Sequence, residues 1–404
     1  MRIALTANGP GEVAGWLRPL LRALYRRDPQ LRAFVFLVPD DYASGFEARI
    51  VRDAFPQATV VEPKRYVKFA LGSRLDEIPA SVDVVQYVGG ELLHAVRVHA
   101  RLNGRAATYK FSRRAYRKVF DRAFALDERN AEQLVGWGMA RERIERVGNL
   151  AIDGALFEAA LPAEPGAPAD GILIMPGSRP YEIENLIPFY FAAALRMLRE
   201  RPEIPIAFAL SPFTSLEYVR AAIERGGIPR MFGRTGRLVT DGGAEYLTTP
   251  SGDVRFPVLT NALSAAKAAR LVLTIPGTKT VEVAALGTPA ITITPLNAPE
   301  YVTINGPLTY LNRVPLIGVP LKRAAAVALS RRFGYHAQPN VDANALLIRE
   351  VHGTITPGRI ARVALESYDD RTWIAQTGER LADLYRDQIG ASDRMAESLL
   401  ALAA

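Results

Sequence analysis

Apolar runs of strand length alternate with amphipathic helical patterns along this chain, and each half opens with a strand–loop–helix unit. In the first half, residues 2–6 read as a strand and residues 16–25 as a helix with leucines at helical spacing. In the second half, residues 171–175 read as the strand and residues 182–199 as the helix. This alternation predicts two Rossmann-like, doubly wound α/β domains.

Further strand-length runs extend the pattern through both halves, at 82–88, 122–126, 143–147, 204–210, 270–275 and 290–294. A hairpin is expected within residues 238–258, and the Pro- and Ala-rich segment 161–170 is the expected linker. We therefore predict an N-terminal domain over residues 1–160 and a second domain over residues 161–365. Helices over residues 366–404 are expected to pack back toward the first domain.

Composition excludes several kinds of catalytic site. The sequence has no cysteine, so disulfides, thiolate metal sites and cysteine nucleophiles are excluded together. Its 4 histidines include no pair at H-x-x-x-H spacing, so a transition metal held by the protein is not expected. No apolar run approaches the ~18–20 residues that span a bilayer, and the N-terminus lacks a signal-peptide pattern. A cytoplasmic protein is expected.

The segment 274–282 has the chemistry of a phosphate-binding turn. A buried strand is expected to end there, a Gly-Thr turn lets the backbone approach an anion, and a helix begins. The glutamate on the first turn would repel a phosphate but fits a ribose diol. A capped helix start without a ligand is the alternative interpretation. The residues assigned to nucleotide binding here are Gly277, Thr278, Lys279, Thr280 and Glu282.

A second turn of this kind lies at residues 176–182, after the first strand of the second half. We assign Gly177, Ser178 and Arg179 to phosphate binding, because the Arg179 guanidinium offers a fork of donors to phosphate oxygens. An ordinary helix cap at Ser178 with a surface arginine is the alternative. Both turns follow predicted parallel strands of one domain, so each strengthens the functional interpretation of the other.

A third turn, Gly9 to Gly15, reads as G-x-G-x-x-x-G after the first strand, and Asp40 follows the next strand. Taken alone this resembles a dinucleotide fingerprint and favours a nicotinamide-dependent oxidoreductase. Glu12 counts against that interpretation because it would repel a pyrophosphate, and Pro10 removes one backbone donor.

These turns, in this order, resemble the lipid-A-disaccharide synthase family of glycosyltransferases. The segment 176–182 matches that family's P-G-S-R-x-x-E motif in full, and 277–282 matches its G-T-x-T-x-E motif, with Pro276 in place of a serine. The remaining counterparts are 11–12 with Gly15, 89–91, 148–153, 339–340 and Glu350. The resemblance implies the GT-B fold, in which two Rossmann-like domains face each other across a cleft.

The departures from the family's motifs fall mainly on the acceptor side. Asn149 and Ala151 stand where the family has histidine and proline, Arg349 replaces a proline, and Gly353 replaces a glutamine. The family's aspartate-bearing acceptor motif is here the segment 90–94. The chain therefore resembles a divergent member whose acceptor differs from lipid A precursors.

What the resemblance implies is inverting transfer of a sugar from a UDP-sugar, with no further cofactor. No D-x-D motif occurs, so Arg179 and the amides near Gly277 are expected to stabilise the leaving diphosphate without a metal. The expected general base is Glu91, then Glu12, then His94. Further residues assigned to the acceptor site or cleft are Asn8, Gly11, Asn149 and Asn340. A UDP-sugar 2-epimerase and a non-catalytic binding protein of the same fold remain alternatives.

A net charge of +8 favours anionic partners. The expected acceptor is lipid-linked or amphipathic, and two segments are candidates for peripheral contact with an anionic membrane. One is the apolar stretch 301–318, and the other is a basic cluster with interleaved aromatics: Tyr109, Lys110, Phe111, Arg113, Arg114, Tyr116, Arg117 and Lys118. A solvated helix face and a core segment are the alternatives. Nucleic acid is not an expected partner, since no recognised binding motif is present, and a homodimer stays open.

Overall fold

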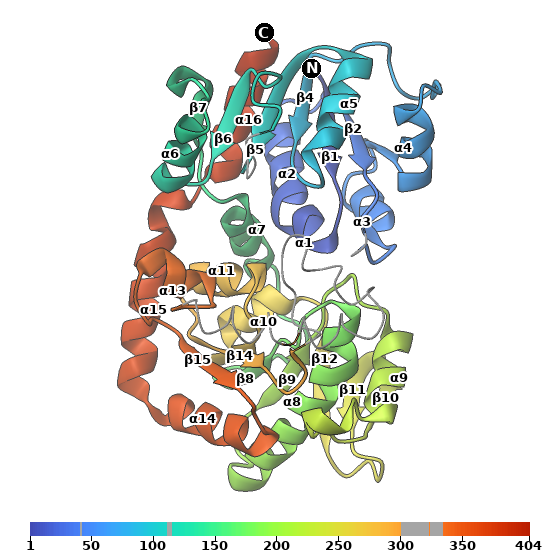
Figure 1. The fold of residues 1–404 in the computed structure, drawn as a ribbon. Coiled ribbons are helices and arrows are strands. Elements are labelled where there is room, and N and C mark those ends of the chain that lie inside the picture. The colour runs from blue at the N-terminus through green and yellow to red at the C-terminus, as the bar shows by residue number, and fades with distance from the viewer. Residues whose placement is uncertain (41–42, 111–114, 300–322, 324–333) are drawn as a thin grey trace. The chain divides into compact units, whose positions relative to one another are not determined.

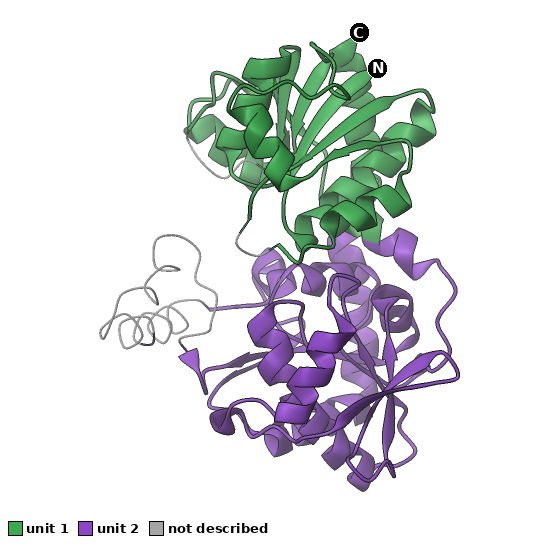
Figure 2. Ribbon diagram, turned by 90° about the vertical axis from the view of Figure 1, so that its right-hand side faces the viewer, with its two compact units in different colours: residues 1–154, 387–404 green, residues 155–386 purple. Residues whose placement is uncertain are grey.

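A computed structural model describes residues 1–40, 43–110, 115–299, 323 and 334–404 of the chain. The chain forms two compact units (Figure 2). Unit 1 contains residues 1–154 and 387–404, and unit 2 contains residues 155–386. The first unit is therefore built from both ends of the sequence.

Unit 1 has a parallel sheet of seven strands in the order β3-β2-β1-β4-β5-β6-β7. The strand order reverses between β1 and β4, which is the Rossmann arrangement. The strands are β1 (Arg2–Ala7), β2 (Arg32–Leu37), β3 (Thr59–Val61), β4 (Val84–Tyr87), β5 (Arg105–Tyr109), β6 (Arg122–Ala125) and β7 (Ile144–Arg146).

The longer helices of unit 1, such as α2 and α5, each bury one apolar face, as their sequence periodicity requires. Phe34 and Phe36 of β2 meet Tyr66 and Phe69 of α4 in a core that is closed to solvent. The helices are α1 (Pro10–Glu12), a π-helical turn (Val13–Leu17), α2 (Arg18–Arg27), α3 (Glu47–Ala54), α4 (Pro63–Ala70), α5 (Leu92–Leu102), α6 (Glu128–Gly136), a 3-10 turn (Arg141–Arg143) and α16 (Ala391–Ala403). A further helix, α7 (Leu150–Ala159), begins in unit 1 and ends in unit 2.

The last helix of the sequence, α16, packs along α2 in unit 1 (Figure 1). Asp153 holds its start, because its two carboxylate oxygens accept hydrogen bonds from the backbone N–H groups of Gly390 (2.7 Å) and Ser392 (2.6 Å). The Arg394 guanidinium donates from Nε and Nη2 to the carbonyl oxygen of Val147, at 2.9 and 2.7 Å. Residues 387–404 are thus fixed to unit 1 by directional bonds as well as by apolar packing.

Unit 2 contains an eight-stranded sheet in the order β10-β11-β12-β9-β8-β13-β14-β15. From β12 to β15 all pairs are parallel and repeat the Rossmann order, while β10 and β11 form the hairpin expected from the sequence. The strands are β8 (Ile172–Ile174), β9 (Ile206–Ala209), β10 (Arg237–Asp241), β11 (Ala244–Thr248), β12 (Arg255–Leu259), β13 (Leu271–Thr274), β14 (Ala290–Pro295) and β15 (Arg349–Gly353).

The longest helix of unit 2, α8, is buried over most of its surface, and α14 and α9 pack against it. Phe189, Tyr190 and Phe191 of α8 join Phe208 and Phe256 from the sheet in one core. The helices are α8 (Pro180–Glu200), α9 (Leu216–Arg225), a 3-10 turn (Pro229–Met231), α10 (Ala262–Ala268), α11 (Thr278–Ala285), α13 (Gln338–Ala343), α14 (Pro357–Asp369), α15 (Arg371–Tyr385) and a 3-10 turn (Arg386–Gln388).

The unit boundaries lie elsewhere than the sequence suggests. The first break falls between Gly154 and Ala155 rather than after residue 160, and α14 and α15 belong to unit 2, so only 387–404 returns to unit 1. The expected linker 161–170 is tied into unit 2. Its Glu164 accepts hydrogen bonds from the backbone N–H groups of Thr260 (2.7 Å) and Asn261 (3.2 Å).

Within the described residues, no helix has both the length and the apolar character needed to cross a membrane. The apolar stretch 301–318 and residues 111–114 of the basic cluster lie outside the described residues. Of the rest of that cluster, Tyr109 is fully buried, and the Lys110 ammonium lies 5.0 Å from the centre of the Trp16 ring. Tyr109, the last residue of β5, therefore belongs to the core of unit 1, whereas Lys110 is exposed and lies over the Trp16 ring.

Candidate functional site

The carboxyl ends of β1, β2, β4 and β5 in unit 1 carry a cluster of polar and charged residues. Asn8 to Glu12 follow β1, Asp40 follows β2, Gly89 to Glu91 follow β4, and Lys110 follows β5. Because β1 and β4 flank the point where the strand order reverses, this edge is where ligands bind in open α/β sheets. The fold thus brings together residues from four separate stretches of sequence.

Glu12 is the most perturbed carboxyl group of this cluster. Its Oε2 atom is buried and has no hydrogen-bond partner among the described residues. Burial, and to a smaller extent the nearby Asp40 carboxylate, raise the pKa of Glu12, and the net value is about 7. Backbone hydrogen bonds from Gly90 and Asn8, together with the Lys110 charge, oppose that rise in pKa. A carboxyl group with a pKa near neutrality can take up or release a proton under ordinary conditions.

Glycine is required where β4 approaches Glu12. A Cβ atom on Gly89 would lie 1.8 Å from Glu12 Oε2. Gly90 has a φ of +86°, and a Cβ there would lie 2.5 Å from Val38 Cγ2. The two glycines therefore let the end of β4 close over the Glu12 carboxylate and shield it from water.

Asn8 and Asp40 complete the turn after β1. Asn8 Oδ1 accepts a hydrogen bond from the backbone N–H of Gly9 at 2.6 Å. Asp40 Oδ2 would lie 2.7 Å from a Cβ on Gly9, so its carboxylate contacts this turn directly. Gly11 is exposed, and a Cβ added there would meet nothing within 4 Å in the described part of the chain. The turn is thus open to a ligand at Gly11 and closed by carboxylates at Gly9 and Gly89.

The other two base candidates have different surroundings. Glu91 is exposed at the N-cap of α5, and its side chain makes no capping hydrogen bond. His94 lies one turn into α5, where its Nδ1 is 2.7 Å from the hydroxyl oxygen of Tyr66. Burial lowers the pKa of His94, and Arg97 lowers it further. Of the three, Glu12 therefore has the environment best suited to a general base at neutral pH.

Asn149 lies in the turn before α7, where its Oδ1 accepts a hydrogen bond from the backbone N–H of Ala151 at 3.1 Å. The buried Tyr109 hydroxyl braces the same turn, because it donates to the Gly148 carbonyl (3.2 Å) and accepts from the Leu150 N–H (3.0 Å). Asn149 therefore acts as a helix cap in this structure.

In unit 2, the two turns assigned to the nucleotide follow β8 and β13, which are neighbouring strands. Leu271 pairs with Ile172 and Leu273 with Ile174, so both strands end at the same edge of the sheet. The Tyr190 hydroxyl on α8 donates to the Thr274 carbonyl at 3.0 Å and ties the end of β13 to that helix. The turns lie where the strand order of the second sheet reverses.

The first of these turns is shaped by Glu182. Its Oε2 accepts hydrogen bonds from the backbone N–H groups of Ser178 (2.8 Å) and Arg179 (2.9 Å). Gly177 has a φ of +108°, and a Cβ there would lie 2.3 Å from the same oxygen. The Arg179 side chain is 46% exposed, with Nη1 3.9 Å from Glu182 Oε1. The guanidinium, rather than the amides that Glu182 already engages, is thus the part of this turn that can reach an anion.

The second turn exposes Gly277 and Thr278 at the start of α11. Thr280 is buried, and its hydroxyl donates to the Gly277 carbonyl at 2.7 Å, which holds the turn in shape. Glu282 is buried too, and its Oε2 lies 2.5 Å from Lys279 Nζ. The structure therefore presents backbone and one threonine hydroxyl outward, with the carboxylate paired to the lysine on the same helix turn.

Asn340 serves the interior of unit 2. It is fully buried; its Nδ2 donates to the Ile348 carbonyl (2.9 Å) and to Glu350 Oε1 (2.7 Å). Its Oδ1 accepts from the N–H groups of Leu347 (2.8 Å) and Ile348 (2.9 Å). Every hydrogen-bonding group of the amide is therefore in use, and Asn340 fixes the loop before β15.

The sequence analysis did not assign the roles that two residues have in these turns: it treated Glu182 only as part of the 176–182 motif and placed Lys110 in the basic cluster for membrane contact. Glu182 lies three residues after Arg179 at the start of a helix, which is the spacing of a capping box. This spacing could have predicted that Glu182 binds the backbone of the turn. Lys110 directly follows a predicted strand, so its place at the sheet edge could also have been found. Its influence on Glu12 needed the three-dimensional strand order.

No family model matches the chain. A curated relative is the lipid-A-disaccharide synthase of Ruegeria pomeroyi, 31% identical over 134 residues, which are 33% of this chain. The match spans only 29% of that relative's length.

Solved structures match almost the whole chain. The S. aureus MnaA–UDP co-structure is 15% identical, with a TM-score of 0.59, over 99% of this chain and 97% of that one. The UDP-GlcNAc 2-epimerase of Neisseria meningitidis bound to UDP-GlcNAc is 12% identical, with a TM-score of 0.56, over 99% and 100%. At such identities the likeness concerns the fold, which is GT-B with two Rossmann-like α/β units and confirms the fold class predicted from the sequence.

Proposed function

We propose that this protein is a UDP-sugar-dependent enzyme of the GT-B fold. In this proposal unit 2 holds the nucleotide and unit 1 supplies acid–base chemistry. The observation that carries it is the pair of turns at residues 176–179 and 276–278, which end neighbouring parallel strands and each open a helix. The N-terminus of α11 and the Arg179 guanidinium, placed together at a strand-order reversal, suit a diphosphate.

The charges of unit 2 suit the leaving diphosphate. The N-terminus of α11 offers backbone N–H groups at Thr278, and the exposed Arg179 side chain offers a charged fork. When a diphosphate arrives, Lys279 can exchange its contact with Glu282 for a phosphate oxygen, which leaves the carboxylate for the ribose hydroxyls. We therefore propose that the two turns bind the nucleotide, and that Lys279 changes partner when it does so. The residues concerned are Gly177, Ser178, Arg179, Gly277, Thr278, Lys279, Thr280 and Glu282.

Glu12 is the proposed general base. Its pKa of about 7 means that both protonation states are populated near neutral pH, which is the condition for efficient proton transfer. The exposed Glu91 and the Tyr66-bonded His94 are the second and third choices. Asp40 and Lys110 are positioning residues in this proposal, since they tune Glu12 through their charges.

One finer candidate is a UDP-sugar 2-epimerase. The observation that favours it is the likeness in fold over almost the whole chain to solved UDP-GlcNAc 2-epimerases. Such an enzyme changes the configuration of the sugar in the absence of any acceptor, so UDP-GlcNAc alone is a sufficient substrate.

The other finer candidate is inverting transfer of the sugar to a lipid-linked or amphipathic acceptor. The local match to a lipid-A-disaccharide synthase and the P-G-S-R-x-x-E segment at 176–182 favour it. Glu12 would accept the proton of the acceptor hydroxyl while the hydroxyl oxygen attacks the anomeric carbon. The bond from that carbon to UDP then breaks, and UDP leaves toward Arg179.

A single experiment tests the proposal and separates the two candidates. UDP-, GDP- and TDP-sugars are titrated onto the protein, and the bound UDP-sugar is then followed by NMR with and without a lipid extract. We expect UDP-sugars to bind; a changed sugar without acceptor indicates the epimerase, and UDP released only with extract indicates the transferase.

Two variants locate the roles. Arg179→Ala should weaken UDP binding, whereas Glu12→Gln should keep UDP binding and lose about 10²- to 10⁴-fold in turnover. Failure of every UDP compound to bind would overturn the proposal. Stabilisation by NADPH instead of UDP would favour a nicotinamide-dependent enzyme that uses the turn at Gly9–Gly15.

A further inference from the structure

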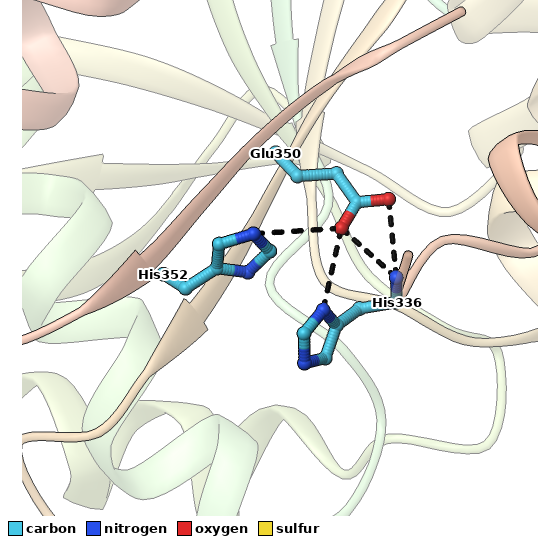
Figure 3. A group of neighbouring side chains, drawn as sticks. All are labelled: His336, Glu350 and His352. Atoms are coloured by element: carbon cyan, nitrogen blue, oxygen red, sulfur yellow. Dashed lines mark hydrogen bonds and ion pairs between the residues drawn. The ribbon is translucent and has the colours of Figure 1, made fainter. Parts of the chain in front are cut away.

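Two histidines and one glutamate converge on the edge strand of unit 2 (Figure 3). Glu350 and His352 lie two residues apart on β15, so their side chains emerge on the same face of the strand. His336 comes from the segment just before α13. The three potential ligand atoms all lie within 4.8 Å of one another.

The Glu350 carboxylate is held in one orientation. Its Oε1 accepts hydrogen bonds from Ala337 N (3.0 Å) and Asn340 Nδ2 (2.7 Å), and the backbone N–H of His336 approaches both oxygens. Its Oε2 faces the two imidazole rings, at 3.4 Å from His336 Nδ1 and 3.7 Å from His352 Nε2. The carboxylate is 3% exposed; both of its oxygens accept hydrogen bonds from the loop backbone, and Oε2 also faces both histidines.

The His336 ring lacks the partners that a buried imidazole needs. Its side chain is 14% exposed and neither ring nitrogen reaches solvent; among the described residues, the one polar contact of the ring is the long 3.4 Å approach of Nδ1 to Glu350 Oε2. A buried polar group left without a partner is destabilising, and native structures rarely leave such groups unexplained. The His336 and His352 ring centres are only 4.4 Å apart. Two neighbouring imidazoles and one carboxylate oxygen thus direct their polar atoms at a common position, where a bound ion could contact all three.

We propose that His336, Glu350 and His352 bind one divalent transition-metal ion of the zinc type. Two nitrogens and one carboxylate oxygen are a zinc ligand set, whereas calcium and magnesium require oxygen ligands. Ligands at about 2.0–2.2 Å from a tetrahedral ion lie about 3.3–3.6 Å apart, close to the two contacts that Glu350 Oε2 already makes. His352 is 38% exposed, so water reaches the fourth position.

This site is separate from the turns assigned to the nucleotide. Those turns follow β8 and β13, while the metal ligands lie on β15 and before α13, with β14 between β13 and β15. A bound ion would tie the edge strand to the segment that begins α13, so its effect is expected on the stability of unit 2. The sequence did not reveal it because His336 and His352 are far from H-x-x-x-H spacing and meet only when the segment around His336 folds against Glu350 of β15.

The test uses the full chain after treatment with a chelator. Zinc sulfate is titrated by calorimetry, and cobalt chloride is titrated while the visible absorption is recorded, since tetrahedral cobalt absorbs strongly. We expect one ion per chain, a cobalt band and a higher Tm with zinc.

The His352→Ala and His336→Ala variants should each weaken zinc binding by about tenfold or more and remove the cobalt band. His99→Ala is the matched control: its imidazole lies in unit 1, where Nε2 is 3.0 Å from the Gly104 carbonyl, and binding should stay unchanged. Circular dichroism of each variant without metal separates lost ligands from lost folding. Absence of zinc binding at micromolar concentrations, or equal binding by all three variants, would refute the site and leave the UDP-sugar proposal untouched.

Discussion

Replacing Glu12 with glutamine should stabilise unit 1, and the gain should depend on pH. Glutamine keeps the shape of the side chain but cannot ionise. In the folded protein burial raises the pKa of Glu12 from its ordinary 4.5 to about 7. Between these two values the unfolded chain carries an ionised carboxylate while the folded chain keeps a proton, so folding becomes less favourable as the pH rises. Below 4.5 both states are protonated and the cost is absent.

The size of the effect follows from the two pKa values. Raising the pKa from 4.5 to about 7 costs the ionised form about 3 kcal/mol, at about 1.4 kcal/mol per pH unit. Because Glu12 is only partly buried as a residue, we discount this cost for solvent screening to about 2 kcal/mol. In a unit of 150–250 residues, each kcal/mol shifts Tm by about 2–4 °C. At a pH above neutrality, the Tm of Glu12→Gln is therefore expected to be about 4–8 °C higher than that of the wild type.

The assay is a thermal melt of the wild type and of Glu12→Gln at about pH 4.5 and about pH 8. The Tm difference between the two proteins should be near zero at the lower pH and largest at the higher pH. Glu91→Gln is the control. Glu91 is exposed at a helix start, so the same substitution there should not give a Tm difference that increases with pH because of burial. A Tm difference for Glu12→Gln that is equal at both pH values would refute the account of a buried, costly carboxylate.

Other perturbations test the remaining geometry. Arg179→Ala should weaken UDP binding by roughly 1.5–3 kcal/mol, about tenfold to over a hundredfold, in calorimetry, and unchanged affinity would remove it from the phosphate site. Gly177→Ala should distort the same turn, because its Cβ would meet Glu182, and UDP affinity should fall while Tm drops by several degrees. Asn340→Ala should destabilise unit 2 by about 2–4 kcal/mol in a denaturant titration, since two buried N–H groups lose their acceptor. If Glu12 is the base, turnover should rise as the pH passes about 7, and a flat profile would point to another group.

The parts of the fold that depend on local pattern were predictable. Residues 2–6 and 171–175 are β1 and β8 within a residue or two, and the helix expected over 182–199 is α8. The adjacency of the turns at 176–179 and 276–278 also followed from parallel strands and the Rossmann order. These inferences needed only periodicity and rules of connection.

The ranking of the candidate bases was not predictable. Glu91 and Glu12 look alike in sequence, and the difference between them arises because Gly89, far along the chain, closes over Glu12. The Glu182 carboxylate likewise accepts hydrogen bonds from the backbone N–H groups of Ser178 and Arg179, two residues that the sequence analysis assigned to phosphate binding. The approach of His336 to His352 depends on how the segment before α13 folds against Glu350 of β15. Such effects are set by long-range contacts, for which a single sequence carries no local signal.

Unit 1 is completed by residues 387–404, which ribosomes make only after all of unit 2. When Val147 and Asp153 have been synthesised, more than half of the polypeptide has not yet been made. The Val147 carbonyl and the Asp153 carboxylate therefore lack their hydrogen-bond donors, which are Gly390, Ser392 and Arg394, until synthesis is nearly finished. The apolar face of α2 that α16 will cover stays bare for the same period. In most multidomain proteins the N-terminal domain can fold first, while the rest of the chain is being synthesised. Here the N-terminal unit cannot be completed until the last residues have been made. In a growing chain, unit 2 is free to fold before unit 1 has received its last helix.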